Sequence, residues 1–436
     1  MNPPTEKNRA YESWRWKIFA ITWLGYAGFY LTRKSFSVAK IGLADEFGFS
    51  NTQLGYYDNA YLWAYMVGQF LWGVSGDKFG PRKIVMAGML CSCLVGFVSG
   101  LTSAILVFAA FGIAQGLCQS TGWPNLVKNM SSWFSQRERG VVMGWWCTNY
   151  AIGGLVASPF AGWAAEQMGS WRWAFFAPAL ALFGIFLLFA FFQRNHPEDV
   201  GLPPIEEYHG EPALVLEEDE TPDEEPEGSW KVIGEVLSHP TVWAMAIVYF
   251  CLKPTRYAIL FWGPKYVNEA SGSGMAESAL VSAMFELAGP LGVLFAGVVS
   301  DKIFKSRRMP IAVIMLGVLA VVLFYFNGLA KGQTSIGVLL FLIGFLLYGP
   351  DSLLSGTAAM DFGTKKGAAT AAGFINGLGS LGAAIGGGMA GWVSDHYGWD
   401  ALFNTFAGMT ILAALLLAPF WNATPATSRG GKKSSP

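Results

Sequence analysis

The sequence has few charged residues for its length. Asp, Glu, Lys and Arg make up 14% of the 436 residues, whereas hydrophobic residues make up 53%. Soluble globular proteins carry about 25% charged residues, so this composition excludes an ordinary soluble domain. The formal net charge is −1, which gives no support for a nucleic-acid partner, and we predict none.

Cysteine and histidine are also scarce. The five cysteines fall in apolar segments without metal-ligand spacing, and we interpret them as small apolar fillers. The four histidines lie in predicted loops or at helix ends, so no titrating histidine is expected in a central cavity. No stretch resembles a nucleotide site or a catalytic triad. We therefore predict that the protein is not an enzyme and binds no metal or cofactor. These residues are Cys91, Cys93, Cys118, Cys147, Cys251, His196, His209, His239 and His396.

Long apolar runs are abundant instead. Each has about 20 residues, which is enough to cross a bilayer as a helix. They lie near 16–38, 55–76, 83–101, 104–127, 140–164, 173–193, 241–267, 278–299, 310–329, 335–355, 368–393 and 399–420. We expect an all-α membrane protein with twelve transmembrane helices, located in the cell inner membrane or plasma membrane.

The basic residues predict the topology. Lys and Arg concentrate at the N-terminus, in the C-terminal tail and in alternate connections, such as the one with Lys78, Arg82 and Lys83. The positive-inside rule then places both termini in the cytoplasm, in agreement with an even number of spans.

One connection is much longer than the others. Residues 194–239 carry thirteen acidic residues between Glu198 and Glu227 and show little apolar periodicity. This composition is typical of a flexible linker, here cytoplasmic and acidic, and a regulatory binding role is the alternative. The linker would separate an N-terminal six-helix bundle at 1–193 from a C-terminal six-helix bundle at 240–436.

The two halves repeat each other. "GVSGDKFGPRK" at 73–83 is echoed by "GVVSDKIFKSRR" at 297–308, and residues 121–140 are echoed by 348–367. At a similar offset, Arg33 of the first run falls on Arg256 of the seventh. Two parallel six-helix repeats are the design in which a transporter binds its substrate at mid-membrane between the halves.

Arg33 lies inside an apolar run, in "GFYLTRKSF" at 28–36. A cation at this depth is costly unless it faces a wet cavity, and two related arginines facing one cavity would attract an anion. The guanidinium fork suits two oxygens of a phosphate. Lys34 is turned by about 100° from Arg33, and Lys253 lies near the face of Arg256. Snorkelling to an interface, or pairing with Glu286, Asp58 or Asp351 for packing alone, remains the alternative.

Further lining residues can be proposed from their chemistry. Hydroxyls, amides and rings suit a polyol phosphate, although aromatic residues in membrane helices also serve packing and interface belts. Tyr30 is favoured because it precedes Arg33 by three residues. The candidates are Tyr30, Tyr65, Gln119, Trp123, Asn149 and Tyr257, with Tyr26, Trp145 and Asn376 as further possibilities.

The motif G-x-x-x-D-K occurs twice and resembles the signature of the major facilitator superfamily. Its acidic residues, Asp77 and Asp301, are expected to act in gating. Glu286 is the expected internal counter-charge.

A second resemblance is more specific and spans both halves. The chain resembles the organophosphate:inorganic phosphate antiporter family, which includes transporters of glycerol-3-phosphate and hexose phosphates. In this family paired arginines hold the phosphate, and the resemblance carries that role onto Arg33 and Arg256. The matching stretches are "RWKIFAITWLGYAGFYLTRKSF" at 15–36, "GWP" with "WFSQRERG" at 122–140, "GLPPIEEY" at 201–208, "TRYAILFWGPKY" at 255–266 and "KKGAATAAGF" at 365–374.

The chain departs from the glycerol-3-phosphate transporter at three positions. Gln69 stands where that relative has a lysine, Asn149 where it has a histidine, and Lys253 where it has a tyrosine. Relative to that transporter, a basic residue is missing from the second helix and an additional one is present in the seventh. The resemblance therefore implies the phosphate group of the substrate, and we do not predict glycerol-3-phosphate as its organic part.

The expected function is exchange of an organic phosphate, of the sugar phosphate or glycerol phosphate class, for inorganic phosphate by a monomer in the lipid bilayer. Substrate anion would neutralise the cations and so lower the barrier to alternating access. The alternatives are a phosphate-ester sensor of the same fold and a proton-coupled symporter of another organic anion, with Glu286, Asp58 or Asp351 as proton carrier.

Overall fold

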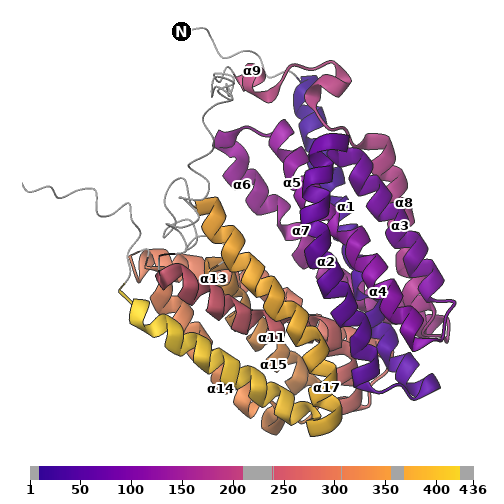
Figure 1. Cartoon of the computed structure of the whole chain (residues 1–436), viewed down its shortest axis with the longest axis vertical. Coiled ribbons are helices and arrows are strands. Elements are labelled where there is room, and N and C mark those ends of the chain that lie inside the picture. Colours follow the sequence, from indigo (N-terminus) through magenta and orange to yellow (C-terminus); the bar gives the residue numbers. More distant parts are fainter. Residues whose placement is uncertain (1–8, 210–237, 239, 306, 355–367, 423–436) are drawn as a thin grey trace, which may run out of the picture. The chain divides into compact units, whose positions relative to one another are not determined.

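The computed structural model describes residues 9–209, 238, 240–305, 307–354 and 368–422. These residues are almost entirely helical and contain no strand, which confirms the predicted all-α class (Figure 1). Residues 210–237 and 239 lie outside the described part, so most of the predicted acidic linker does too. Eight of the described helical stretches are long and apolar enough to cross a membrane.

The chain divides into two compact units, each described here by itself. Unit 1 comprises residues 1–43 and 60–221, and unit 2 comprises 44–59 and 222–436. Helix α2 therefore begins in unit 2 and continues in unit 1. The helices up to the long connection are α1 (Arg9–Phe47), α2 (Asn51–Phe79), α3 (Pro81–Ser99), α4 (Ile105–Ser120), α5 (Gly122–Trp133), α6 (Gln136–Trp146), α7 (Thr148–Gln167), α8 (Trp173–Phe192), η1 (Pro197–Val200) and α9 (Ile205–His209).

The helices after the long connection belong to unit 2. They are α11 (Pro240–Ser271), α12 (Met275–Ser282), α13 (Met284–Lys302), α14 (Arg308–Leu329), α15 (Gln333–Ser352) and α17 (Ala368–Leu417), with η3 (Ala418–Phe420). Helix α17 covers the last two predicted spans, and it turns at Gly398, whose φ of 79° is unfavourable for other residues. Within unit 2, α11 packs against α17 and α15, and α13 packs against α15.

Several predicted spans are made of two consecutive helices. The fourth span is α4 followed by α5, with a turn at Thr121. Pro124 lies at the third position of α5. It has no N–H to donate to the carbonyl of Ser120, so one α-helical hydrogen bond is missing across this turn. The fifth span is likewise α6 and α7, and the eighth is α12 and α13.

The core of unit 1 is rich in aromatic residues. Buried Tyr26, Phe29, Trp133 and Trp146 pack with aliphatic residues of α3, α5 and α8. Helix α3 contacts α4, α5 and α8, and Figure 1 shows it beside α8. Burial of these large rings helps to hold α1 against its neighbours.

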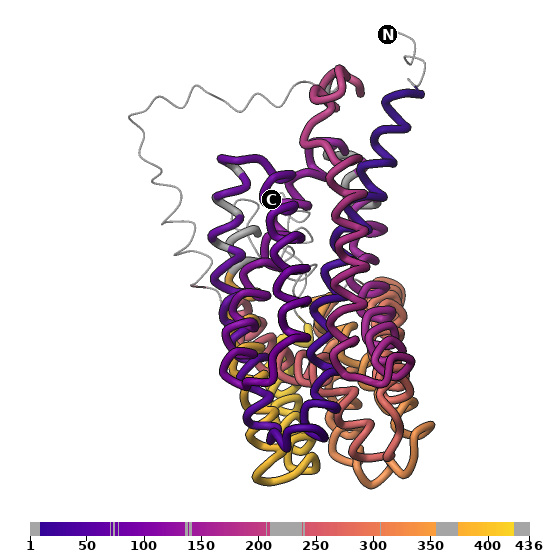
Figure 2. The backbone as a smooth tube through the Cα atoms, turned by 90° about the vertical axis from the view of Figure 1, so that its right-hand side faces the viewer, coloured from indigo at the N-terminus to yellow at the C-terminus, as the bar shows by residue number. Residues whose placement is uncertain are grey.

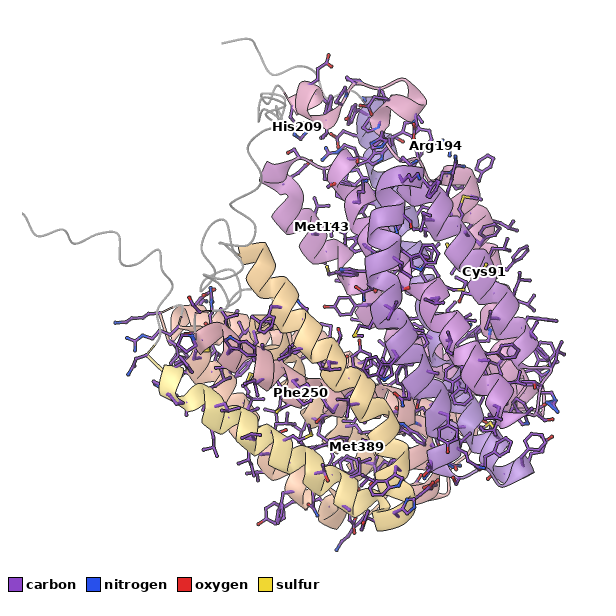
Figure 3. The ribbon with its side chains drawn as sticks, in the orientation of Figure 1. Cys91, Met143, Arg194, His209, Phe250 and Met389 are labelled. Atoms are coloured by element: carbon purple, nitrogen blue, oxygen red, sulfur yellow. The ribbon has the colours of Figure 1, made fainter. Side chains whose placement is uncertain are left out.

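Close helix contacts position the central side chains. A Cβ at Gly153 of α7 would lie 2.9 Å from the carbonyl oxygen of Ala27, and one at Gly382 of α17 would lie 2.3 Å from that of Phe250. Phe250, labelled in Figure 3, belongs to α11 of unit 2 and is half-buried. Only glycine allows these approaches, which bring α7 onto α1 and α17 onto α11.

Residues after α8 return to the first turn of α1. The rings of Tyr11 and Tyr208 stack with centroids 3.9 Å apart, and Tyr11 donates a hydrogen bond to the carbonyl of Pro203 at 3.0 Å. Figure 2 traces α9 at the same end of unit 1 as the beginning of α1.

Candidate functional site

Arg33 lies in α1 and is held by neutral groups. Its side chain is buried, with 6% of the residue exposed. Nε donates a hydrogen bond to Oε1 of Gln119 at 3.0 Å, and the guanidinium lies 4.4 Å from the ring centre of Tyr30 and 5.0 Å from that of Tyr65. Three predicted site residues therefore surround Arg33. Their arrangement leaves the positive charge uncompensated by any of them.

The amide of Gln119 is fixed in orientation. Tyr61 donates to Oε1 at 2.8 Å, while Nε2 donates to Thr32 at 3.1 Å and to Gln115 at 3.2 Å. This network directs the amide oxygen towards Arg33 and holds the guanidinium in place. Tyr61, which we did not predict, is part of the site; its signal is its spacing of four residues from Tyr65 on one face of α2.

Arg33 keeps an unused donor. Nη2 is buried and has no hydrogen-bond partner among the described residues, and the described part of the chain offers Arg33 no ion pair. A buried cation with an unfilled donor is costly unless a ligand completes it. The surroundings of Arg33 are therefore suited to an anion.

Asn149 belongs to α7, which packs against the helix that carries Arg33. It is fully buried, and neither its amide nitrogen nor its amide oxygen has a hydrogen-bond partner in the residues described. Gly153, one turn further along α7, contacts Ala27 and Tyr30 of α1, so Asn149 lies close to the face that approaches α1. A buried amide without partners is typical of a group that bonds to a ligand.

Trp123 belongs to an aromatic cluster in unit 1. Its ring lies 5.3 Å from Tyr26 and 5.6 Å from Trp146. The hydroxyls of Tyr26 and Tyr65 are 3.5 Å apart. This cluster links the surroundings of Arg33 to α5 and α6, and it offers an apolar surface with a few hydroxyls for an organic group.

Arg256 lies in α11 of unit 2 and has an acidic partner. Nη1 donates to Oδ2 of Asp351 at 2.7 Å, and Nζ of Lys253 lies 3.6 Å from Oδ1 of the same carboxylate. The Arg256 guanidinium lies 4.5 Å from the ring centre of Tyr348, and the Lys253 ammonium lies 4.5 Å from that of Tyr249. All three charged side chains are largely buried, with exposed fractions of 17%, 11% and 8% for Arg256, Lys253 and Asp351.

Tyr348 and Tyr249 were absent from our candidates. Tyr348 precedes Asp351 by three residues in α15 and so shares its face, which is a signal that the sequence carried. Tyr257, which we did predict, has its ring centre 5.7 Å from the Lys253 ammonium.

The other candidates are placed as follows. Lys34 of α1 and Asp58 of α2 are buried, and so is Glu286 of α13. Asp301 is exposed and pairs with Arg308. Asp77 lies in α2, but its side chain is outside the described residues. The gating roles of Asp77, Asp301 and Glu286 stay predictions.

Comparison with known proteins decides the family. The family model of the Major Facilitator Superfamily matches residues 22–387. The chain belongs to this superfamily. Curated relatives include the glycerol-3-phosphate transporter of Bacillus subtilis, 34% identical over 96% of this chain and 95% of the relative, and a probable hexose phosphate transport protein of Chlamydia pneumoniae, 32% identical over 97% and 94%.

The fold comparison agrees with this membership. The crystal structure of a bacterial homologue of the human lysosomal transporter Spinster matches with a TM-score of 0.72, covering 94% of this chain and 97% of that one at 14% identity. Together with the curated relatives, this identifies a multi-pass membrane transporter with the twelve-helix major facilitator fold, in the organophosphate:phosphate antiporter family.

Proposed function

We propose that the protein exchanges an organic phosphate for inorganic phosphate by alternating access, and that Arg33 and Arg256 bind the phosphate group. The observation that carries the proposal is Arg33: a buried guanidinium held by Gln119 and two tyrosine rings, with Nη2 unfilled among the described residues. A phosphate, like a carboxylate, offers two oxygens at the spacing of the guanidinium fork, and the choice of phosphate rests on the resemblance to phosphate-ester transporters.

The substrate class is supported by the relatives. Those named above transport glycerol-3-phosphate in one case and are described as hexose phosphate transport proteins in the other. The phosphate-binding part of the site would be the same as in these relatives, because this chain has both Arg33 and Arg256. Asn149, Trp123, Tyr30 and Tyr65 would then contact the organic part, with Lys34, Lys253 and Tyr257 as additional contacts.

Exchange follows from the charge on Arg33. Burying an uncompensated cation more deeply during a conformational change is unfavourable. A bound phosphate dianion removes this cost, so the loaded transporter crosses between its two states more readily than the empty one. Each outward step with one phosphate compound then requires an inward step with another. Asp77 and Asp301 would act at the helix ends as gating residues.

The membrane arrangement belongs to the same proposal. The protein would act as a monomer with both termini in the cytoplasm, and the acidic segment near 194–239 would link the six-helix bundles at 1–193 and 240–436. The distribution of Lys and Arg supports this orientation.

The test is uptake of labelled inorganic phosphate by reconstituted vesicles. Vesicles preloaded with inorganic phosphate should take up the label, and vesicles loaded with succinate should not. Equal uptake into both would contradict exchange. Uptake that instead needs a proton gradient would favour the symporter, and phosphate binding without uptake under any loading would favour the sensor.

A further inference from the structure

The two arginines have different electrostatic surroundings. Arg33 meets neutral partners among the described residues, whereas Arg256 donates to the carboxylate of Asp351. Helices α11 and α15 contact each other within unit 2 and bring these groups together (Figure 1). The two arginines occupy equivalent positions in the sequence repeat, but only Arg256 has a carboxylate partner among the described residues.

One carboxylate faces two cations. Oδ2 of Asp351 is 2.7 Å from Nη1 of Arg256, and Oδ1 is 3.6 Å from Nζ of Lys253. With all three groups ionised, this cluster carries a net charge of +1, and without Asp351 it would carry +2. Asp351 thus halves the net positive charge of this three-residue cluster.

This arrangement restricts what else can approach Arg256. An anion that binds the Arg256 guanidinium shares it with Asp351, whose carboxylate is already hydrogen-bonded to Nη1. A second acidic group on the same molecule would find fewer uncompensated cations and a carboxylate of like charge nearby. At the short distances and low effective dielectric of a buried site, such repulsion is strong.

We propose that Asp351 is a specificity-determining residue: it admits phosphate esters whose organic part is neutral and disfavours those whose organic part carries a carboxylate. The inference rests on the proposed function, because it assumes that the phosphate binds at Arg256. It adds to that function the charge that the organic part of the substrate is allowed to carry.

Glycerol-3-phosphate and 3-phosphoglycerate test this inference, because they differ in one position: a CH2OH group in the first is a carboxylate in the second. Both are used to compete with labelled inorganic phosphate for exchange by the full chain in vesicles. Wild type should favour glycerol-3-phosphate by about tenfold or more, which corresponds to about 1.4 kcal/mol. Asp351→Asn should shift this ratio towards 3-phosphoglycerate by about tenfold.

Two further variants separate charge from packing. Asp351→Glu keeps the carboxylate and should keep the preference of wild type. Glu277→Gln removes one negative charge from an exposed position in the first turn of α12 and should leave the ratio unchanged.

The possible results are distinct. If wild type accepts 3-phosphoglycerate as well as glycerol-3-phosphate, the inference is wrong whether or not Asp351→Asn folds. An unchanged ratio in folded, exchanging Asp351→Asn would make Asp351 a structural partner of Arg256 only. If wild type exchanges no inorganic phosphate at all, the proposed function itself fails, and this inference fails with it.

Discussion

The guanidinium of Arg33 and the amide of Gln119 are joined by a hydrogen bond of 3.0 Å between Nε and Oε1, and Tyr61 and Thr32 fix the same amide from its other sides. A neutral acceptor holds the arginine without cancelling its charge. This arrangement keeps an uncompensated cation in position for an anion, which is what a phosphate site requires.

Gln119→Glu should weaken phosphate binding. The substitution keeps the shape but places a carboxylate 3.0 Å from Arg33, where it competes with the phosphate. Charged hydrogen bonds contribute about 1.5–3 kcal/mol, so we expect the affinity for inorganic phosphate to fall by about tenfold or more. Calorimetric titration of the purified protein measures it. Gln167→Glu, the same change at the exposed end of α7, is the control, and equal affinities in both variants would remove Arg33 from the site.

Lysine should not replace either arginine. Arg33→Lys and Arg256→Lys keep the charge but lose the planar fork that binds two phosphate oxygens. We expect each variant to fold and insert while losing nearly all phosphate exchange in vesicles. Near-normal exchange by a variant would show that the arginine in question does not bind the phosphate.

Asp395 should stabilise the beginning of α2 in a pH-dependent way. Its carboxylate accepts hydrogen bonds from the backbone N–H groups of Asn51 (2.8 Å) and Thr52 (2.5 Å), all within unit 2. Partial burial opposes ionisation, but the hydrogen bonds from Thr52 and Asn51 outweigh it and lower the pKa of Asp395. A lowered pKa in the folded state adds stability above the unfolded value of about 3.9, and this stability is lost as the pH falls through the folded value.

Asp395 is largely exposed, so solvent screens its contacts, and Asp395→Asn should lower the free energy of unfolding by about 1 kcal/mol or less at neutral pH. The difference from wild type should shrink as the pH falls below about 4. Thermal unfolding in detergent across this pH range measures it, with exposed Asp400→Asn as the control. A difference that stays constant with pH would mean that the ionised carboxylate is not the stabilising group.

Tyr208 should stabilise the packing of residues 197–209 against the beginning of α1. Its ring stacks on Tyr11, and its hydroxyl lies 3.3 Å from the Glu12 carboxylate, to which it donates. Tyr208→Ala should speed proteolysis within residues 197–209 several-fold, because the stacking and the hydrogen bond are both lost. Tyr208→Phe keeps the stacking and should stay close to wild type. Equal cleavage of wild type and Tyr208→Ala would show that the stacking does not hold the segment.

The sequence predicted much of this architecture and some of the residues that surround Arg33. Apolar runs gave the spans because their length is fixed by the bilayer. The proximity of Tyr30 to Arg33 followed from helical spacing alone. The approach of Gln119 to Arg33 is a contact between helices, and its prediction rested on residue chemistry.

Other features depended on tertiary packing. The sequence contained three possible acidic partners for the central cations, Glu286, Asp58 and Asp351. The packing of α15 against α11 shows that Asp351 contacts both Lys253 and Arg256. Pro124 signals the break between α4 and α5, but no proline lies near the break at Cys147 between α6 and α7. Such positions depend on neighbouring helices, which a local pattern does not describe.

The central claim is coupled exchange, and its most direct test counts both compounds in one experiment. Vesicles are loaded with labelled inorganic phosphate and placed in differently labelled glycerol-3-phosphate or hexose phosphate. The account predicts that inorganic phosphate leaves only when an organic phosphate enters, in a fixed ratio, and that Arg33→Lys abolishes both movements. Efflux of inorganic phosphate at the same rate without any external phosphate compound would contradict it.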